Sequence, residues 1–393
     1  MRAYLSVLGA LLLFAGVPIA SAADQLTLLE GQEIAAELTA ISDTGLLGGS
    51  AVPAGLDLNS LRRIERTVAA PAAEKPTVVL DLVGGGKILA TSVSVAAEKF
   101  TIQWPHGEAL LLPIDAVRAV RFRAAVNDDS FEAALKKPSA DSDRLFVEID
   151  GKLSMLVGLI DSLADGKITF QYEGQTQTVA TDKLFGFVVA QASAPPATDS
   201  GVVVELADGA RVAGVVKSLT DGKLTITIGV SSQVIVPWAV VKTIEVRSPR
   251  LAFLSDLEPI RVDERRLVTL PEAWQRDRNI QGKTLLLGER KFTKGIGTHS
   301  YSELAFNVDG KFDGFAAVIG LDAAAEGKGD CVFVVQGDGR ELLRERVTGR
   351  VAPKVIKLDI KNVKELVLIV EPGEELDLGD LADWADARVI RQK

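Results

Sequence analysis

The stretch that decides the fold reads Val202-Val203-Val204-Glu205-Leu206-Ala207-Asp208-Gly209 and continues with Arg211-Val212-Ala213-Gly214-Val215-Val216. Apolar residues alternate at period two along it, which is the pattern of a half-buried β-strand. The Asp-Gly pair between the two runs favours a tight hairpin, because glycine adopts positive φ without a steric penalty. A second pair, Asp221-Gly222, precedes the run from Lys223 to Ile228. The pattern predicts a small antiparallel β module over residues 200–248.

The same order of strands and turns recurs upstream of this module. Three more copies are predicted at residues 24–68, 77–126 and 144–190, joined by polar or Pro- and Ala-rich linkers. One linker includes Ser130 to Lys136, which could form one or two helical turns. A recurring unit of this size indicates supersecondary modules that are stacked or strung together.

The strand and turn order of the four modules resembles that of small SH3-like or Sm-like barrels. Sm-like proteins bind RNA, but the formal net charge of this chain is -9, which argues against a partner held by phosphate contacts. We therefore expect no nucleic-acid partner. The modules are interpreted as structural or adaptor units, because a fold alone does not define a function.

The amino-acid composition is that of a folded, cysteine-poor chain. Of the 393 residues, 47% are hydrophobic and 25% are charged. Two His and one Cys exclude a zinc finger and a disulfide framework. Cys331 stands in the apolar run Cys331 to Val335 and is predicted to be buried as a small hydrophobe.

The first residues have the parts of a secretory signal peptide. Met1-Arg2 is a short basic region, Leu5 to Val17 is almost wholly apolar, and Ala20-Ser21-Ala22 is a small-residue cleavage site. We expect residues 1–22 to be removed and the mature protein to be secreted or periplasmic. An uncleaved anchor is the alternative. No later segment is apolar for eighteen residues, so no membrane span is predicted in the mature chain.

The pattern of apolar runs and connecting segments changes at about Leu254. Short apolar runs with long connections predict an all-β domain, a sandwich or jelly roll, over residues 253–393. Four segments stand out in it: Lys294-Gly295-Ile296-Gly297-Thr298-His299-Ser300, Val318-Ile319-Gly320-Leu321-Asp322, Gly337-Asp338-Gly339 and Asp383-Trp384-Ala385-Asp386-Ala387. The two glycines before His299 suggest a bend in the backbone.

These four segments, in this order, resemble the NPCBM family of carbohydrate-binding modules, whose members accompany family 98 glycoside hydrolases. The resemblance implies a galactose-binding-like β-sandwich and a glycan-binding role. The opening Leu254-Ser255-Asp256-Leu257-Glu258-Pro259 and Trp274 resemble the extended form found in planctomycete-type secreted proteins. The sugar itself is not implied by the resemblance.

A neutral sugar is recognised by an aromatic face and by fixed polar groups. The aromatic candidates are Trp274 and Tyr301, because Trp384 lies beside an apolar closing strand and is expected in the core. The polar candidates are Asn279, His299, Asp383 and Arg388. His299 could instead hydrogen-bond a neighbouring loop, since buried polar groups need partners in any case.

Seven acidic residues and no basic residue lie between Glu371 and Asp386. Calcium takes six to eight oxygen ligands, and galactose-binding-like sandwiches often hold a structural calcium ion. The run lacks EF-hand spacing, so a solvated acidic loop is favoured slightly over a metal site. If calcium binds, its predicted ligands are Asp380, Asp383 and Asp386.

The sequence contains no Gly-x-Ser-x-Gly, His-Glu-x-x-His or phosphate-cradling motif. Its carboxylates lie in turns, with no catalytic domain of the usual glycosidase size around them. We therefore expect a secreted, non-catalytic carbohydrate-binding protein. The alternative is a structural or scaffold protein of the envelope that uses the same domains for protein contacts.

Overall fold

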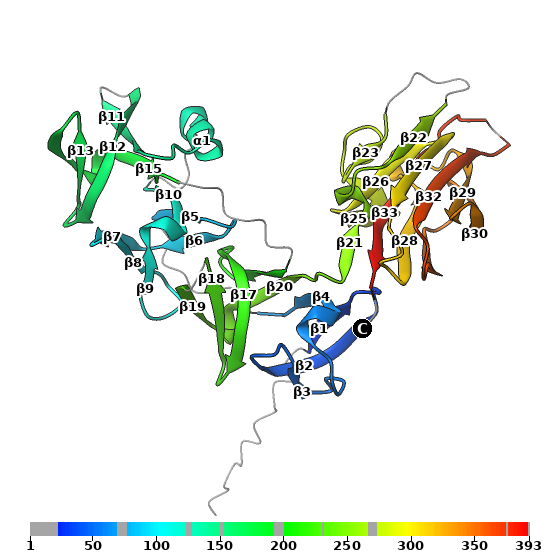
Figure 1. Cartoon of the computed structure of the whole chain (residues 1–393), viewed down its shortest axis with the longest axis horizontal. Helices are drawn as coiled ribbons and strands as arrows, with labels where there is room; N and C mark the ends of the chain where they lie inside the picture. Colours follow the sequence, from blue (N-terminus) through cyan, green and yellow to red (C-terminus); the bar gives the residue numbers. More distant parts are fainter. Residues whose placement is uncertain are drawn as a thin grey trace, which may run out of the picture.

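The computed structural model describes residues 23–68, 77–122, 128–149, 152–191, 200–229, 232–265, 273–374 and 376–391. The predicted signal peptide, residues 1–22, lies outside them. Figure 1 shows four small β units, coloured blue to green, and a separate β-sandwich, coloured yellow to red. The all-β prediction with a C-terminal sandwich is confirmed, and the likeness of the small units to SH3-like barrels stays a prediction.

The four units share one plan, in which a short 3-10 turn precedes the last strand. Unit 1 holds β1 (Asp24–Leu28), β2 (Glu33–Ile41), β3 (Leu47–Ser50) and β4 (Leu61–Glu65). Unit 2 holds β5 (Val78–Leu82), β6 (Lys87–Ala90), β7 (Ser92–Ala96), β8 (Lys99–Gln103), β9 (Leu110–Pro113) and β10 (Val117–Arg121). Unit 3 holds β11 (Asp143–Ile149), β12 (Lys152–Ala164), β13 (Lys167–Tyr172), β14 (Gln175–Ala180) and β15 (Leu184–Val188). Unit 4 holds β16 (Gly201–Leu206), β17 (Arg211–Thr220), β18 (Lys223–Ile228), β19 (Ser232–Pro237) and β20 (Val241–Arg247).

The predicted hairpin turns form as the Asp-Gly pairs require. Asp221 and Gly222 have φ of 51° and 68°, and Asp165 and Gly166 have φ of 50° and 71°. Both central residues of each turn are left-handed, which matches the twist of the flanking strands. The predicted helical turns are the helix α1 (Asp129–Lys136), whose first backbone amides are capped by the Asp128 carboxylate.

The units do not follow one another in space as they do in the chain. Strand β4 of unit 1 pairs with β20 of unit 4, β6 of unit 2 meets β17 of unit 4, and β10 of unit 2 pairs with β15 of unit 3. The spatial order is therefore unit 1, unit 4, unit 2, unit 3 (Figure 1). One buried apolar cluster runs through all four units, so each small core is extended by its neighbours.

The C-terminal domain is a sandwich of two antiparallel sheets. The first sheet has the order β23 (Gln275–Arg276), β26 (Gly295–His299), β33 (Leu381–Ile390), β28 (Gly314–Leu321) and β31 (Lys354–Asp359), with β21 (Leu251–Phe253) on β33. The second has the order β22 (Arg261–Glu264), β27 (Ser302–Asn307), β32 (Glu365–Pro372), β29 (Asp330–Gly337) and β30 (Arg340–Thr348). A small hairpin, β24 (Leu285–Leu287) and β25 (Arg290–Phe292), packs on the first sheet.

The core between the two sheets is aromatic at its centre. Trp384 is fully buried, as predicted, and its ring meets that of Phe333 edge to face with the centroids 4.8 Å apart. Cys331 is fully buried in the same cluster, and burial raises the pKa of its thiol well above the ordinary value.

The bend predicted at Gly295-Ile296-Gly297 is wrong, because these residues belong to the regular strand β26. The segment needs a glycine for a different reason. A Cβ on Gly297 would lie 2.4 Å from the Arg278 carbonyl oxygen and 2.5 Å from Asn279 Cα. Gly297 therefore lets the chain at 278–279 cross directly over the strand, which positions Asn279.

Candidate functional site

Two of the predicted sugar-binding residues, Trp274 and His299, meet at one end of the sandwich, where β22 and β26 end. The link between them is Glu264, the last residue of β22. Its Oε1 accepts a hydrogen bond from the Trp274 backbone N–H at 3.0 Å and lies 3.3 Å from Nε2 of His299. The Glu264 side chain is 18% exposed, whereas the His299 side chain is 4% exposed and its Nε2 is buried without a hydrogen bond.

His299 is held in one orientation on the inner side of this cluster. The residue is 3% exposed, and its Nδ1–H donates to the Ser300 carbonyl oxygen at 2.8 Å. This bond turns Nε2 toward Glu264, so the two groups form an ion pair when the ring is protonated.

Tyr301 lies near in sequence, but its half-buried ring packs on a separate apolar cluster that includes Ala305, Val334 and Ile369 of the second sheet. Its hydroxyl donates to Glu303 Oε2 at 3.0 Å, and the Arg265 guanidinium lies 5.2 Å from the ring centroid. Burial, with the hydrogen bond to Glu303, raises the pKa of the Tyr301 hydroxyl. The tyrosine therefore stays neutral and presents both a ring and a polar tip at the rim.

Trp274 is half-buried, and it is a less open platform than the sequence predicts. Its ring packs against the sandwich core, and the Arg276 guanidinium lies 4.9 Å from the ring centroid. Arg276 is fixed there by hydrogen bonds from Nη1 to the carbonyl oxygens of Ser255 and Leu257, at 3.0 and 2.9 Å. One side of the indole is thus already occupied by a cation–π contact.

Asn279 and Asp383 lie elsewhere, beneath the outer surface of the first sheet. The Asn279 amide donates to Asp322 Oδ1 at 3.0 Å and accepts from the Lys283 backbone N–H at 2.8 Å. Asp383 is 1% exposed and faces Asp322. Burial, with the neighbouring Asp322 carboxyl group, raises the pKa of Asp383 well above its ordinary value. These residues hold the loop at 279–283 onto the sheet.

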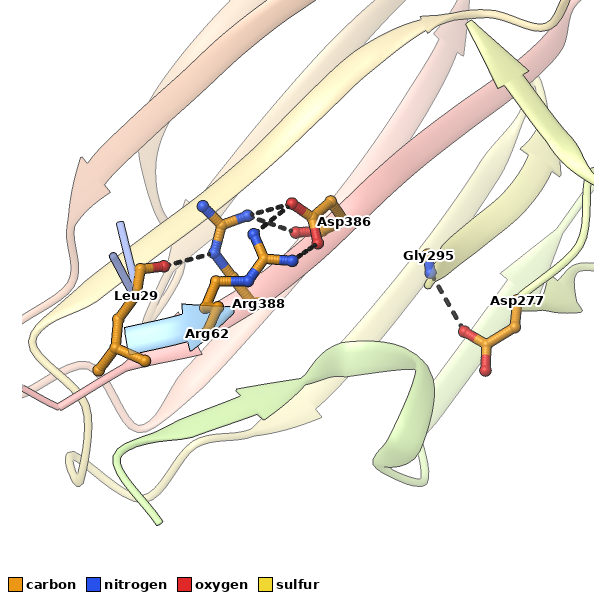
Figure 2. Close-up of polar contacts among 6 residues, drawn as sticks. All are labelled: Leu29, Arg62, Asp277, Gly295, Asp386 and Arg388. Carbon is orange, nitrogen blue, oxygen red and sulfur yellow. Dashed lines mark hydrogen bonds and ion pairs between the residues drawn. The ribbon is translucent and has the colours of Figure 1, made fainter. Parts of the chain in front are cut away.

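Arg388 lies at the junction of the sandwich with unit 1, at the opposite end of β33 (Figure 2). Its Nε donates to the Leu29 carbonyl oxygen at 2.9 Å, and its Nη1 donates to Asp386 Oδ2 at 2.8 Å. Asp386 also accepts from both Nη atoms of Arg62, at 2.6 and 2.7 Å. Arg388 is thus buried between two domains, and burial lowers the pKa of its guanidinium to about 10.

The three predicted calcium ligands are not brought together. Asp380 accepts hydrogen bonds from the Ser300 hydroxyl and, at 2.8 Å, from the Asp330 N–H. Asp383 faces Asp322, and Asp386 faces the two arginines at the junction. Among the described residues, no group of three or more His, Cys, Asp or Glu side chains could hold a metal ion.

Glu264 is the residue that the sequence interpretation missed. It is one of 53 acidic residues in the chain, and nothing in its immediate sequence distinguishes it. Only the antiparallel pairing of β22 with β27, which sets Glu264 opposite Ser302, brings its carboxylate beside His299.

A cavity of about 460 Å³ lies at the junction, away from this cluster. It is lined by Glu30 of unit 1 and by residues of β28, β31 and β33, among them Phe315, Lys357 and Asp359. Its charges are mixed, so they select no ligand class. No helix in the described part of the chain is long and apolar enough to cross a membrane.

The C-terminal third is a β-sandwich module with an aromatic, carboxylate and imidazole cluster at one end. Residues 251–390 match the NPCBM/NEW2 domain, which confirms the family resemblance of the sequence motifs and supports carbohydrate binding by this domain. The planctomycete subgroup stays a prediction.

A curated relative from Renibacterium salmoninarum, "Putative endo-alpha-N-acetylgalactosaminidase", is 33% identical over 110 residues. That match covers 28% of this chain and only 7% of the relative. Two solved structures from Clostridium perfringens are also similar. The CBM51-2 and INT domains of ZmpB in complex with GlcNAc are 28% identical, with a TM-score of 0.33, over 43% of this chain and 36% of that chain. The CBM51 of GH95 in complex with methyl-galactose is 26% identical, with a TM-score of 0.33, over 35% of this chain and 99% of that chain.

Proposed function

We propose that this chain is a secreted, non-catalytic protein that binds a glycan at the end of its sandwich. The observation that carries the proposal is the partly exposed Glu264 carboxylate, which joins Trp274 to His299. The domain match at residues 251–390 supports the same role, since the NPCBM family is named after carbohydrate binding.

The chemistry of the cluster suits a sugar ring. The exposed parts of the Trp274 and Tyr301 rings offer apolar surface for sugar C–H groups, and the partly exposed Glu264 carboxylate accepts hydrogen bonds from hydroxyls. Glu264 is fixed by its two contacts before a ligand arrives, so little conformational entropy is lost when the ligand binds. The four units then act as a support that carries the sandwich.

A glycan array, probed with residues 23–393, tests the proposal. We expect selective binding to a small set of sugars and loss of that binding in Glu264→Gln. The matched control is Glu205→Gln, which removes a carboxylate from the ion pair with Lys242 in unit 4. If no glycan binds, and proximity labelling returns only protein partners, the envelope scaffold is the better account.

Two further parts of the proposal have separate tests. For export, N-terminal sequencing of material outside the cytoplasm should start at Ala23, and a sequence that starts at Met1 contradicts it. For the absence of catalysis, bound glycans should be recovered unchanged after long incubation, and the appearance of new reducing ends contradicts it.

A further inference from the structure

The four units meet one another through equivalent residues. In the contact of unit 1 with unit 4, Ile64 pairs with Ile244, and each is the fourth residue of its unit's last strand. In the contact of unit 2 with unit 3, Val120 pairs with Phe187, again the fourth residues. Pairing of a position with its own counterpart is the mark of a local two-fold axis.

A second pairing in each contact obeys the same rule. Ile41 meets Leu219, and Val95 meets Leu163. Ile41, Leu219 and Leu163 occupy the same place, since each follows a β-bulge in the second strand of its unit. The pairs 1:4 and 2:3 are therefore two quasi-symmetric dimers within one chain.

The contact between units 4 and 2 joins the two dimers. It involves β17 and β6, and it too pairs equivalent positions of the two units. Arg211 pairs with Lys87. Arg211 lies eight positions before Leu219 (219 − 211), and Lys87 lies eight before Val95 (95 − 87). This contact is reinforced by a buried hydrogen bond between His106 Nε2 and Asp208 Oδ2, at 2.7 Å.

Counting eight positions back from Leu163 in unit 3 gives Met155. Gly158 supports this alignment, because it corresponds to Gly214 of unit 4. A Cβ on either glycine would strike a strand carbonyl, at 2.1 Å from Gln171 O and at 2.3 Å from Thr227 O. Met155 thus occupies the place of Lys87 and Arg211.

The edge of unit 3 that carries Met155 has no strand beside it. Residues 152–158 of β12 pair with β11 on one side, and no strand among the described residues pairs with the other side. Met155, Val157 and Leu159 point to one face of this edge and are 51%, 46% and 51% exposed. An unpaired strand edge with exposed apolar side chains is a template for another strand.

The opposite end of the row of units is already covered. There the turn before β2 of unit 1 docks on the sandwich, where Leu29 packs against Ala316 and Ile390 and bonds Arg388. Unit 3 is thus the one end of the row that stays uncovered in the described structure.

We propose that β12 of unit 3 pairs antiparallel with β12 of a second copy of this chain, about a two-fold axis at Met155. In the contact of units 4 and 2 this position sets Arg211 opposite Lys87, and in the proposed dimer it sets Met155 opposite a second methionine. The exposed apolar rows of the two copies would become one continuous row. This self-association goes beyond the proposed glycan binding and does not depend on it.

Sedimentation equilibrium of residues 23–393 tests the proposal. We expect a reversible dimer, which Met155→Lys weakens by about tenfold, since it removes the apolar contact of both methionines from the paired edge. The matched control is Val215→Lys, a 53% exposed valine on the corresponding strand of unit 4, which should leave the dimer unchanged. A monomer at every concentration, or a dimer that Met155→Lys does not weaken, overturns the proposal.

A disulfide trap gives an independent readout. Opposed residues of an antiparallel pair have the Cα separation that a disulfide needs. Met155→Cys should therefore form a covalent dimer under mild oxidation, and Val215→Cys should not. Cys331 does not compete, because it is fully buried. Equal cross-linking of the two variants contradicts a two-fold axis at Met155.

Discussion

Asp386→Asn should loosen the junction of the sandwich with unit 1. Asp386 has a φ of 54°, a left-handed conformation that asparagine tolerates, so this variant keeps the backbone and the side-chain size. It removes the charge that Arg62 and Arg388 share. It also turns an amide N–H group toward guanidinium donors, with which it cannot form a hydrogen bond.

The expected loss follows from the burial of the two arginines. The Arg62 side chain is 22% exposed and can turn to solvent, so its loss is at most about 1 kcal/mol. The Arg388 side chain is 5% exposed and would stay buried without a counter-ion. Breaking a buried pair in this way costs about 3–5 kcal/mol. Arg388 keeps its hydrogen bonds to backbone carbonyls in the variant. The expected loss in free energy of unfolding is therefore near the lower end of this range, about 3 kcal/mol.

Urea unfolding of residues 23–393, followed by tryptophan fluorescence, measures the loss. The double variant Asp386→Asn/Arg388→Met should recover most of it, because no buried charge is then left unpaired. Glu205→Gln, which breaks an exposed pair, is the control and should change stability by less than about 1 kcal/mol. The reasoning is refuted if Asp386→Asn matches this control, or if the double variant is less stable than the single one.

Three more outcomes are expected. Trp274→Ala should reduce glycan affinity with a small change in melting temperature, whereas Trp384→Ala should cost about 3–5 kcal/mol of stability. Calorimetry measures the affinity and thermal melts measure the stability. If the two variants show the opposite effects, Trp384 is the sugar platform and Trp274 is the core residue. Burial raises the pKa of Asp380 from 3.8 to about 6, so the folded chain binds this proton more readily, and Asp380 adds about 2 kcal/mol of stability as the pH falls from 6 to 4. Asp380→Asn should lack that gain in melts across this range, and identical pH profiles contradict the assignment. EDTA should leave the melting temperature unchanged, because Asp380 and Asp386 already have protein partners; a fall that calcium reverses would show a metal site.

The local structure of this chain was predictable because its signals are local. The period of two and the Asp-Gly pairs define hairpins within a few residues, as the φ values of Asp221 and Gly222 show. The fate of Trp384 was predictable for the same reason, since it stands among closing-strand residues that are all apolar or buried.

What the sequence does not determine is which surfaces meet. Arg62 and Asp386 are 324 positions apart, and no periodicity links them. Arg388 is predicted as a polar group for sugar hydroxyls, but the docking of Leu29 buries it. The order of the four units is hidden likewise, because each unit carries similar edges and only long-range packing selects among them.

Titration calorimetry with a glycan from the array, on wild-type residues 23–393 and on Glu264→Gln, tests the central claim most directly. The account predicts saturable binding by the wild type. It predicts at least about tenfold weaker binding by Glu264→Gln, since a hydrogen bond to a charged group contributes about 1.5–3 kcal/mol. The two proteins should melt at the same temperature. Equal affinities for wild type and Glu264→Gln would contradict a glycan site at Glu264, Trp274 and His299.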